Sequence, residues 1–195
     1  KEQYDVYKSV SLKFEKALNN VIDPKEDIVW VHDYHLMLLP NLIRQNYNDV
    51  PIGFFLHIPF PAYEVFQLLP SKWRVEILEG LLGADSIGFH THEYTDNFLR
   101  ATLRFLSLEN HLGVINNKGR LIKVGTHPIS IDYLKFNNAA KSNSVVLKAT
   151  EIKKQFNNKK VIFSVDRLDY TKGIINRLLG FEYFLEQYPD WREKI

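Results

Sequence analysis

The feature that most constrains the fold is a regular alternation between short apolar runs and longer segments in which apolar residues recur at helical spacing. The runs comprise residues 28–31, 52–56, 86–89 and 161–165. Their β-branched and aromatic side chains are typical of strands buried in a parallel sheet, so Trp30, Phe54, Phe55 and Phe89 are expected in the core. Strands that alternate with helices of about 10 to 15 residues indicate βαβ units. The sequence therefore predicts an α/β fold on a doubly wound parallel sheet, with helices on both faces.

One stretch departs from this alternation. Residues 112–115 and 121–125 flank Asn116-Asn117-Lys118-Gly119, a turn sequence that predicts a hairpin. Residues 126–132 are expected to be extended because Pro128 restricts its own backbone and that of the residue before it. The small, polar residues 137–143 that follow indicate a surface connection near a domain junction.

Polar residues that can bind ligands or transfer protons follow four of the predicted strands. They are His32-Asp33, His57, His90-Thr91 and Asp166-Arg167. In doubly wound folds the carboxyl ends of the strands share one crevice, and ligands bind there. The recurrence favours a functional site over four unrelated structural residues.

Two cations, Arg167 and Lys172, lie between the strand predicted at 161–165 and the helix predicted after Gly173. Helix N–H groups and cationic side chains at such a position favour anion binding. An ordinary loop with two solvated cations is the alternative, and the pattern alone leaves both open.

The segment His32-Asp33-Tyr34-His35 contains metal-ligand residue types, but it lacks the helical H-E-x-x-H spacing, so no metal site is predicted. Asp33 is expected to accept hydrogen bonds from sugar hydroxyls; the alternative is that it caps a helix near His35, and both roles can hold for different oxygens of the carboxylate. His57 precedes the stiff loop Ile58-Pro59-Phe60-Pro61, so it is expected to be a rigidly held donor beside a substrate.

Composition and missing motifs exclude several classes of function. The 25 basic and 23 acidic residues are interspersed, which argues against nucleic-acid binding. No apolar run approaches the ~20 residues of a membrane span, and the absence of cysteine suits a cytoplasmic protein. The motifs of serine hydrolases, dinucleotide-binding dehydrogenases and P-loop kinases are missing. A first residue other than Met and a last residue in a charged segment suggest a piece of a longer protein.

Long, ordered motifs resemble the trehalose-6-phosphate synthase family of retaining glucosyltransferases. They are His32-Asp33-Tyr34-His35-Leu36-Met37-Leu38-Leu39-Pro40, Ile52-Gly53-Phe54-Phe55-Leu56-His57-Ile58-Pro59-Phe60-Pro61, Leu81-Leu82-Gly83-Ala84-Asp85 and Asp166-Arg167-Leu168-Asp169-Tyr170-Thr171-Lys172-Gly173. The resemblance covers about residues 28–190 and implies a glycosyltransferase-B architecture, in which two Rossmann-like domains face each other across a cleft. Residues 1–130 would form the later part of the N-terminal, acceptor domain. Residues 131–195 would form the crossover and the first units of a truncated C-terminal, nucleotide-sugar domain.

The resemblance also implies an activity: transfer of glucose from UDP-glucose to glucose 6-phosphate, with retention, no metal and no cofactor. Arg167 and Lys172 would hold the UDP diphosphate. Asp33 would contact glucose 6-phosphate and His57 the transferred glucose, and these two are the expected catalytic residues. The departing phosphate would take the acceptor proton in a front-face attack.

Departures from the family pattern leave alternatives. Ser130 stands where the family usually has glycine, and Ala62-Tyr63 replaces smaller polar residues. The family's N-terminal glycine loop and its later carboxylate loop have no counterpart in these residues. The isolated chain is expected to be inactive, because one strand after the crossover cannot bury its helices as a domain. A regulatory or fused synthase–phosphatase subunit, a homo-oligomer, another phosphorylated acceptor and a nucleotide other than UDP all remain open.

Overall fold

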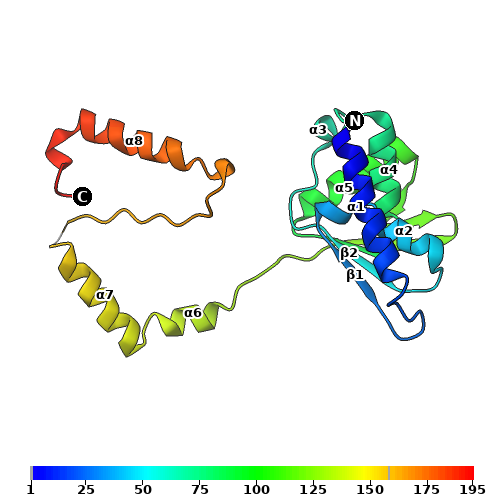
Figure 1. Cartoon of the computed structure of the whole chain (residues 1–195), viewed down its shortest axis with the longest axis horizontal. Helices are drawn as coiled ribbons and strands as arrows, with labels where there is room; N and C mark the ends of the chain where they lie inside the picture. The colour runs from blue at the N-terminus through cyan, green and yellow to red at the C-terminus, as the bar shows by residue number, and fades with distance from the viewer. Residues whose placement is uncertain (1, 158) are drawn as a thin grey trace. The chain divides into compact units, whose positions relative to one another are not determined.

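The computed structural model describes residues 2–157 and 159–195. Its contacts divide the chain into two compact units, Lys1–Ser130 and Ile131–Ile195 (Figure 1). The assignment of these units to an acceptor domain and a nucleotide-sugar domain remains a prediction. Among the described helices, none combines the length and apolar character that a bilayer span requires.

The first unit is built on a six-stranded sheet with the order β1-β2-β3-β6-β5-β4. The strands are β1 (Val29–His32), β2 (Ile52–Phe55), β3 (Ser86–Phe89), β4 (Asn110–His111), β5 (Val114–Asn117) and β6 (Arg120–Thr126). β1, β2, β3 and β6 pair in parallel, whereas β4, β5 and β6 pair antiparallel. The predicted α/β class and mostly parallel sheet are confirmed. The predicted hairpin is β5–β6, and its second strand also extends the parallel sheet.

Burial alternates along the strands, so the two faces of the sheet differ. Phe54 and Phe89 belong to the buried core, as predicted. Trp30 lies on the opposite face and is 67% exposed, so its assignment to the core was wrong. Phe55 is only partly buried on that same face. Among the described residues of the first unit, helices cover only one face of the sheet, so the prediction of helices on both faces is wrong for this unit.

The helices of the first unit contact one another and the buried face of the sheet (Figure 1). They are α1 (Glu2–Leu18), η1 (Tyr34–Leu36), α2 (Leu39–Asn46), α3 (Tyr63–Phe66), α4 (Ser71–Leu81) and α5 (His92–Leu106). Pro40 lies in the first turn of α2, where its missing N–H disrupts no helical hydrogen bond. Thr91 caps α5 by accepting a hydrogen bond from the N–H of Tyr94.

The connection from α4 to β3 depends on a close approach of two backbones. A Cβ atom on Gly83 would lie 2.2 Å from the backbone nitrogen of Asn41 in α2. Only glycine allows this approach without displacing backbone atoms. The motif Leu81-Leu82-Gly83-Ala84-Asp85 therefore has a structural role, since it packs the end of α4 onto the start of α2.

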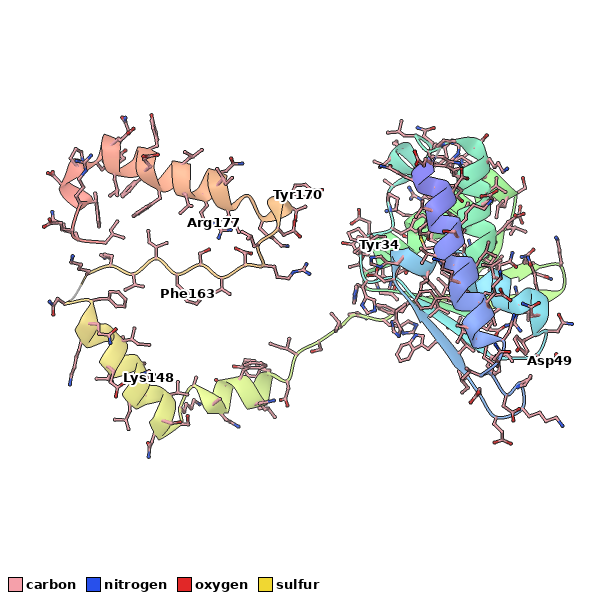
Figure 2. All side chains as sticks on the ribbon, viewed as in Figure 1. Tyr34, Asp49, Lys148, Phe163, Tyr170 and Arg177 are labelled. Carbon is pink, nitrogen blue, oxygen red and sulfur yellow. The ribbon has the colours of Figure 1, made fainter. Side chains whose placement is uncertain are left out.

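The second unit contains helices but no strand among its described residues. Its elements are α6 (Tyr133–Ala139), α7 (Asn143–Gln155), η2 (Tyr170–Lys172), α8 (Ile174–Gln187) and η3 (Pro189–Trp191). The strand predicted at residues 161–165 is extended and exposed, with Phe163 at 82% and the nearby Tyr170 at 95% (Figure 2). The prediction of a buried strand is wrong for this chain, because the described residues of the unit provide no neighbouring strand.

Candidate functional site

The carboxyl ends of the four parallel strands place histidines at one edge of the sheet. His32 ends β1, His57 and His90 follow β2 and β3, and His127 follows β6. The first three were predicted from the sequence, whereas His127 was not, because β6 was predicted only as part of a hairpin. An apolar strand that ends in Thr126-His127 was the available signal. Asp166-Arg167, the fourth predicted strand end, lies in the second unit and follows no strand.

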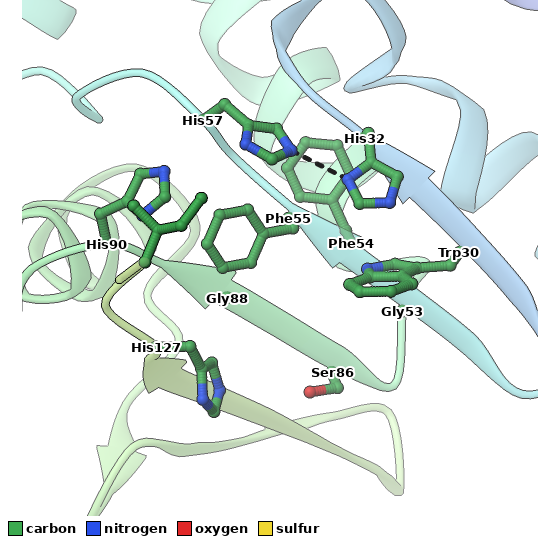
Figure 3. A pocket seen from close by; sticks show the side chains of 11 residues that line it. Trp30, His32, Gly53, Phe54, Phe55, His57, Ser86, Gly88, His90 and His127 are labelled. Atoms are coloured by element: carbon green, nitrogen blue, oxygen red, sulfur yellow. Dashed lines mark hydrogen bonds between the residues drawn. The ribbon is translucent and has the colours of Figure 1, made fainter. Parts of the chain in front are cut away.

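The four histidines are among the residues that line a cavity of about 450 Å³ on the exposed face of the sheet (Figure 3). Its lining consists of Trp30, His32, Gly53, Phe54, Phe55, His57, Ser86, Gly88, His90, His127 and Ile129. The Phe55 ring lies over Gly88, because this strand residue has no side chain: a Cβ atom on Gly88 would lie 2.7 Å from Cδ2 of Phe55. Aromatic walls with a few polar groups are typical of small-molecule sites.

Two of the histidines are joined directly. Nδ1 of His32 lies 2.9 Å from Nε2 of His57, and this hydrogen bond is the dashed line in Figure 3. The ring of His57 also contacts Phe55 and His90, with centroid distances of 4.9 Å and 5.8 Å. His57 is therefore held from several sides.

The loop after His57 is anchored in the core, which fits the rigidity expected of it. Phe60 is buried among Phe66, Phe89 and Phe98, with ring centroids 5.2 to 6.0 Å apart. Nδ2 of Asn97 donates to the Phe60 carbonyl at 3.2 Å. Because Phe60 lies only three positions beyond His57, its anchoring restricts where the His57 backbone can move.

Asp33 lies beside His57 in an unusual backbone conformation, with φ 70° and ψ 170°. Its N–H donates to the Phe55 carbonyl at 2.8 Å, and its Oδ1 accepts a long hydrogen bond from the His57 N–H at 3.4 Å. The side chain makes no capping hydrogen bond to η1, so the capping alternative is wrong. Conformations of this kind cost about 1–3 kcal/mol and occur preferentially at functional sites.

His35, the other histidine of the motif, has no close polar contact with Asp33. Its Nδ1 is 4.0 Å from Oδ2 of Asp33, and its ring lies against Tyr34 with centroids 3.8 Å apart. Among the described residues there is no group of three or more His, Cys, Asp or Glu side chains arranged to hold a metal ion.

In the second unit, Arg167 and Lys172 flank Asp169. The carboxylate of Asp169 accepts hydrogen bonds from the N–H and Oγ1 of Thr171, both at 2.9 Å. These hydrogen bonds lower the pKa of Asp169, and the charges of Arg167 and Lys172 lower it further. Both cations are exposed, and neither side chain donates a hydrogen bond to another described residue.

Arg177 of α8 holds this loop together, a role that was not predicted from the sequence. Its Nη1 donates to Oδ2 of Asp166 at 2.8 Å and also contacts Oγ of Ser164. Its Nη2 donates to the Lys172 carbonyl at 3.3 Å. The sequence feature that could have predicted this role is the position of Arg177, one helical turn after Gly173 and therefore near the loop. Arg177 thereby connects both ends of the loop that carries the two cations.

The chain is similar to curated proteins of trehalose metabolism along nearly its whole length. It is 47% identical over 191 residues to the bifunctional trehalose-6-phosphate synthase/phosphatase of Thermoproteus tenax, covering 98% of this chain and 26% of that protein. It is 43% identical over 199 residues to the UDP-forming alpha,alpha-trehalose-phosphate synthase of Schizosaccharomyces pombe, covering 100% of this chain and 38% of that protein. The chain thus spans well under half the length of either relative.

A solved structure supports the same relationship. The alpha,alpha-trehalose-phosphate synthase (UDP-forming) of Burkholderia xenovorans, in complex with glucose-6-phosphate, superposes with a TM-score of 0.81 at 31% identity. The match covers 99% of this chain and 42% of that one. The sequence profile described as Glycosyltransferase family 20 matches residues 1–195. The chain belongs to glycosyltransferase family 20.

Proposed function

We propose that the chain is part of a retaining glucosyltransferase that moves glucose from UDP-glucose to glucose 6-phosphate, giving trehalose 6-phosphate and UDP. The observation that carries this proposal is the convergence of Asp33 and His57 at one edge of the sheet, within motifs of the family. The related proteins agree with it, since one is named as UDP-forming and a solved neighbour is in complex with glucose-6-phosphate.

In this proposal the residues of the two units have different roles in the reaction. The C1–O bond to the UDP phosphate breaks, negative charge grows on the leaving diphosphate, and Arg167 and Lys172 stabilise it. The acceptor hydroxyl attacks C1 from the same face and gives its proton to a departing phosphate oxygen. Asp33 accepts hydrogen bonds from glucose 6-phosphate hydroxyls, and His57 orients the transferred glucose.

The test uses the complete gene product, because the chain spans only a fraction of its relatives. UDP release from UDP-glucose is measured with glucose 6-phosphate and with a panel of other phosphorylated acceptors. Glucose 6-phosphate is expected to give the highest kcat/KM, and a clear preference for another acceptor would overturn the acceptor assignment. The same assay with ADP-glucose and GDP-glucose tests the nucleotide.

Arg167→Ala and Lys172→Ala test the diphosphate contact. Each removes a charge-assisted hydrogen bond worth about 1.5–3 kcal/mol, so kcat/KM is expected to fall about 10- to 150-fold. Because both side chains are exposed, the free energy of unfolding should barely change. Lys159→Ala, an exposed cation outside the loop, is the matched control. Unaltered kcat/KM in both loop variants would contradict their role.

The Thermoproteus tenax relative, a bifunctional synthase/phosphatase, favours one further candidate: fusion to a phosphatase domain. A D-x-D-x-T motif downstream in the complete gene product would support it, and phosphate release from trehalose 6-phosphate would test it. A cytoplasmic location, consistent with the absence of cysteine, and a homo-oligomeric state belong to the same proposal. Fractionation and light scattering of the complete protein test these two points.

A further inference from the structure

The pair formed by His32 and His57 is constrained by its surroundings (Figure 3). The two rings stack with centroids 5.2 Å apart and planes inclined by 27°. Trp30 lies against His32 at a centroid distance of 4.5 Å, and Phe55 lies against His57 at 4.9 Å. Both histidines are exposed, so these aromatic contacts and the 2.9 Å hydrogen bond are the interactions that restrict their rings.

The hydrogen bond couples the protons of the two rings. A neutral imidazole carries one N–H, and its other nitrogen is an acceptor. If Nδ1 of His32 donates, Nε2 of His57 is bare and Nδ1 of His57 carries a proton. If Nε2 of His57 donates, Nδ1 of His57 is bare. The state of His32 therefore decides whether Nδ1 of His57 offers a donor or an acceptor.

Nδ1 is the nitrogen of His57 that remains for a ligand. Nε2 is occupied by His32, and the structure gives Nδ1 no hydrogen-bond partner among the described residues. The ring lines the cavity, so this nitrogen is the polar atom that His57 can present there. A sugar hydroxyl can meet either a donor or an acceptor, but its own orientation differs between the two cases.

We propose that His32 is a positioning residue that fixes the ring orientation and a single tautomer of His57. It does so through the Nδ1–Nε2 hydrogen bond. The functional part of this inference rests on the proposed function, in which His57 contacts the transferred glucose. The structural part concerns only these two side chains and can be tested without activity.

The first experiment records the ring ¹⁵N shifts of His57 by long-range ¹H–¹⁵N correlation at about pH 8.5, where free imidazole is neutral. The unmodified 195-residue chain is expected to show one dominant tautomer, with one protonated and one bare nitrogen. His32→Leu should move the two shifts toward each other, because the unpaired ring exchanges between tautomers. His111→Leu, at an exposed position on β4, should change neither shift.

Two polar variants separate a hydrogen bond from general packing. The amide of Asn reaches about the position of histidine Nδ1, whereas the amide of Gln reaches about that of Nε2. Since His32 bonds through Nδ1, His32→Asn should keep His57 in one dominant tautomer and His32→Gln should not. Unchanged shifts in His32→Leu, or equal retention by Asn and Gln, would overturn the inference.

Kinetics of the complete protein then connect the pair to catalysis. His32→Leu is expected to lower kcat about 10- to 100-fold with little change in the KM for UDP-glucose, because a reoriented His57 misplaces the bound sugar. His32→Asn should restore most of the loss, and His111→Leu should behave like the parent. If the complete protein transfers no glucose while the NMR effect is present, the proposed function fails and the positioning of His57 by His32 stands.

Discussion

At the scale of single residues, Asp33 combines a strained backbone with a proposed role in ligand binding. Its φ of 70° and ψ of 170° lie where residues with a Cβ atom are disfavoured, and its carboxylate accepts from the N–H of His57. No local sequence pattern requires this conformation. It is maintained by the hydrogen bond from the Asp33 N–H to the Phe55 carbonyl, which joins the end of β1 to β2.

We therefore expect Asp33→Gly to be more stable than Asp33→Ala by about 1 kcal/mol, because glycine relieves part of the strain of about 1–3 kcal/mol. At an ordinary strand position the order reverses, since glycine loses more backbone entropy on folding. Lys123→Gly and Lys123→Ala in β6 provide that comparison. Urea denaturation measures all four variants, and an Asp33→Ala variant at least as stable as Asp33→Gly would refute the strain.

Glu76 gives stability a dependence on pH. Burial raises the pKa of this carboxyl, but its hydrogen bond from Lys8 and the charges of Lys8 and Lys72 outweigh burial, so the pKa is lowered. The ion pair joins α4 to α1, with Nζ of Lys8 3.1 Å from Oε1. Because the folded pKa is depressed, its stabilisation is present above the unfolded value of about 4.3 and is lost as pH falls through the folded value.

Glu76→Gln is accordingly expected to reduce stability at pH 7 by no more than about 1 kcal/mol, since the pair is partly exposed. The difference from the parent should shrink as pH falls below about 4.3. Denaturation midpoints between about pH 7 and pH 3 measure it, with exposed Glu2→Gln as the control. A difference that stays constant across this range would exclude Glu76 as its source.

At the scale of elements, Asp85 ties helices and strands together at the amino ends of the strands. Its carboxylate accepts from Nη2 of Arg44 at 2.6 Å, from the N–H of Ile52 at 2.8 Å and from Nη1 of Arg120 at 3.3 Å. Arg120 also donates to the carbonyls of Gly83 and Ala84 after α4. Burial lowers the pKa of Arg120, and so does the charge of Arg44, whereas Asp85 opposes both.

Asp85→Ala should thus lower the free energy of unfolding by about 3 kcal/mol, because two guanidinium groups would lose their shared partner. Asp49→Ala, at an exposed position before β2, should stay within about 0.5 kcal/mol of the parent. Guanidinium denaturation compares them. Equal midpoints for the two variants would show that the cluster contributes no net stability.

The elements also show what sequence patterns can and cannot predict. Strand runs and the hairpin turn are local, so β1, β2, β3 and the β5–β6 pair follow from propensity and spacing. The parallel pairing of β6 with β3 joins distant segments and has no local signature, so His127 was missed. Trp30 was misassigned because a strand pattern does not say which face another layer will cover.

At the scale of the whole molecule, the two units differ in how much of their apolar surface they bury. The first unit holds every member of the buried hydrophobic core among the described residues. In the second unit, apolar residues such as Val161, Phe163 and Leu168 are exposed, and no strand pairs with residues 161–165. Ordering the backbone costs about 1–2 kcal/mol of conformational entropy per residue, and a segment that buries so little apolar surface does not offset this cost.

Hydrogen exchange is expected to separate the units. Amides of β2 and β3, hydrogen-bonded and covered, should exchange orders of magnitude more slowly than those of residues 161–168, which have no ladder hydrogen bonds. Exchange followed by mass spectrometry on the 195-residue chain measures both sets. The same lack of partners leads us to expect no UDP-glucose turnover by this chain, since the loop of Arg167 and Lys172 is not supported by a sheet. Strong protection of residues 161–168, or measurable turnover, would contradict this account and would mean that the second unit completes its fold within these residues.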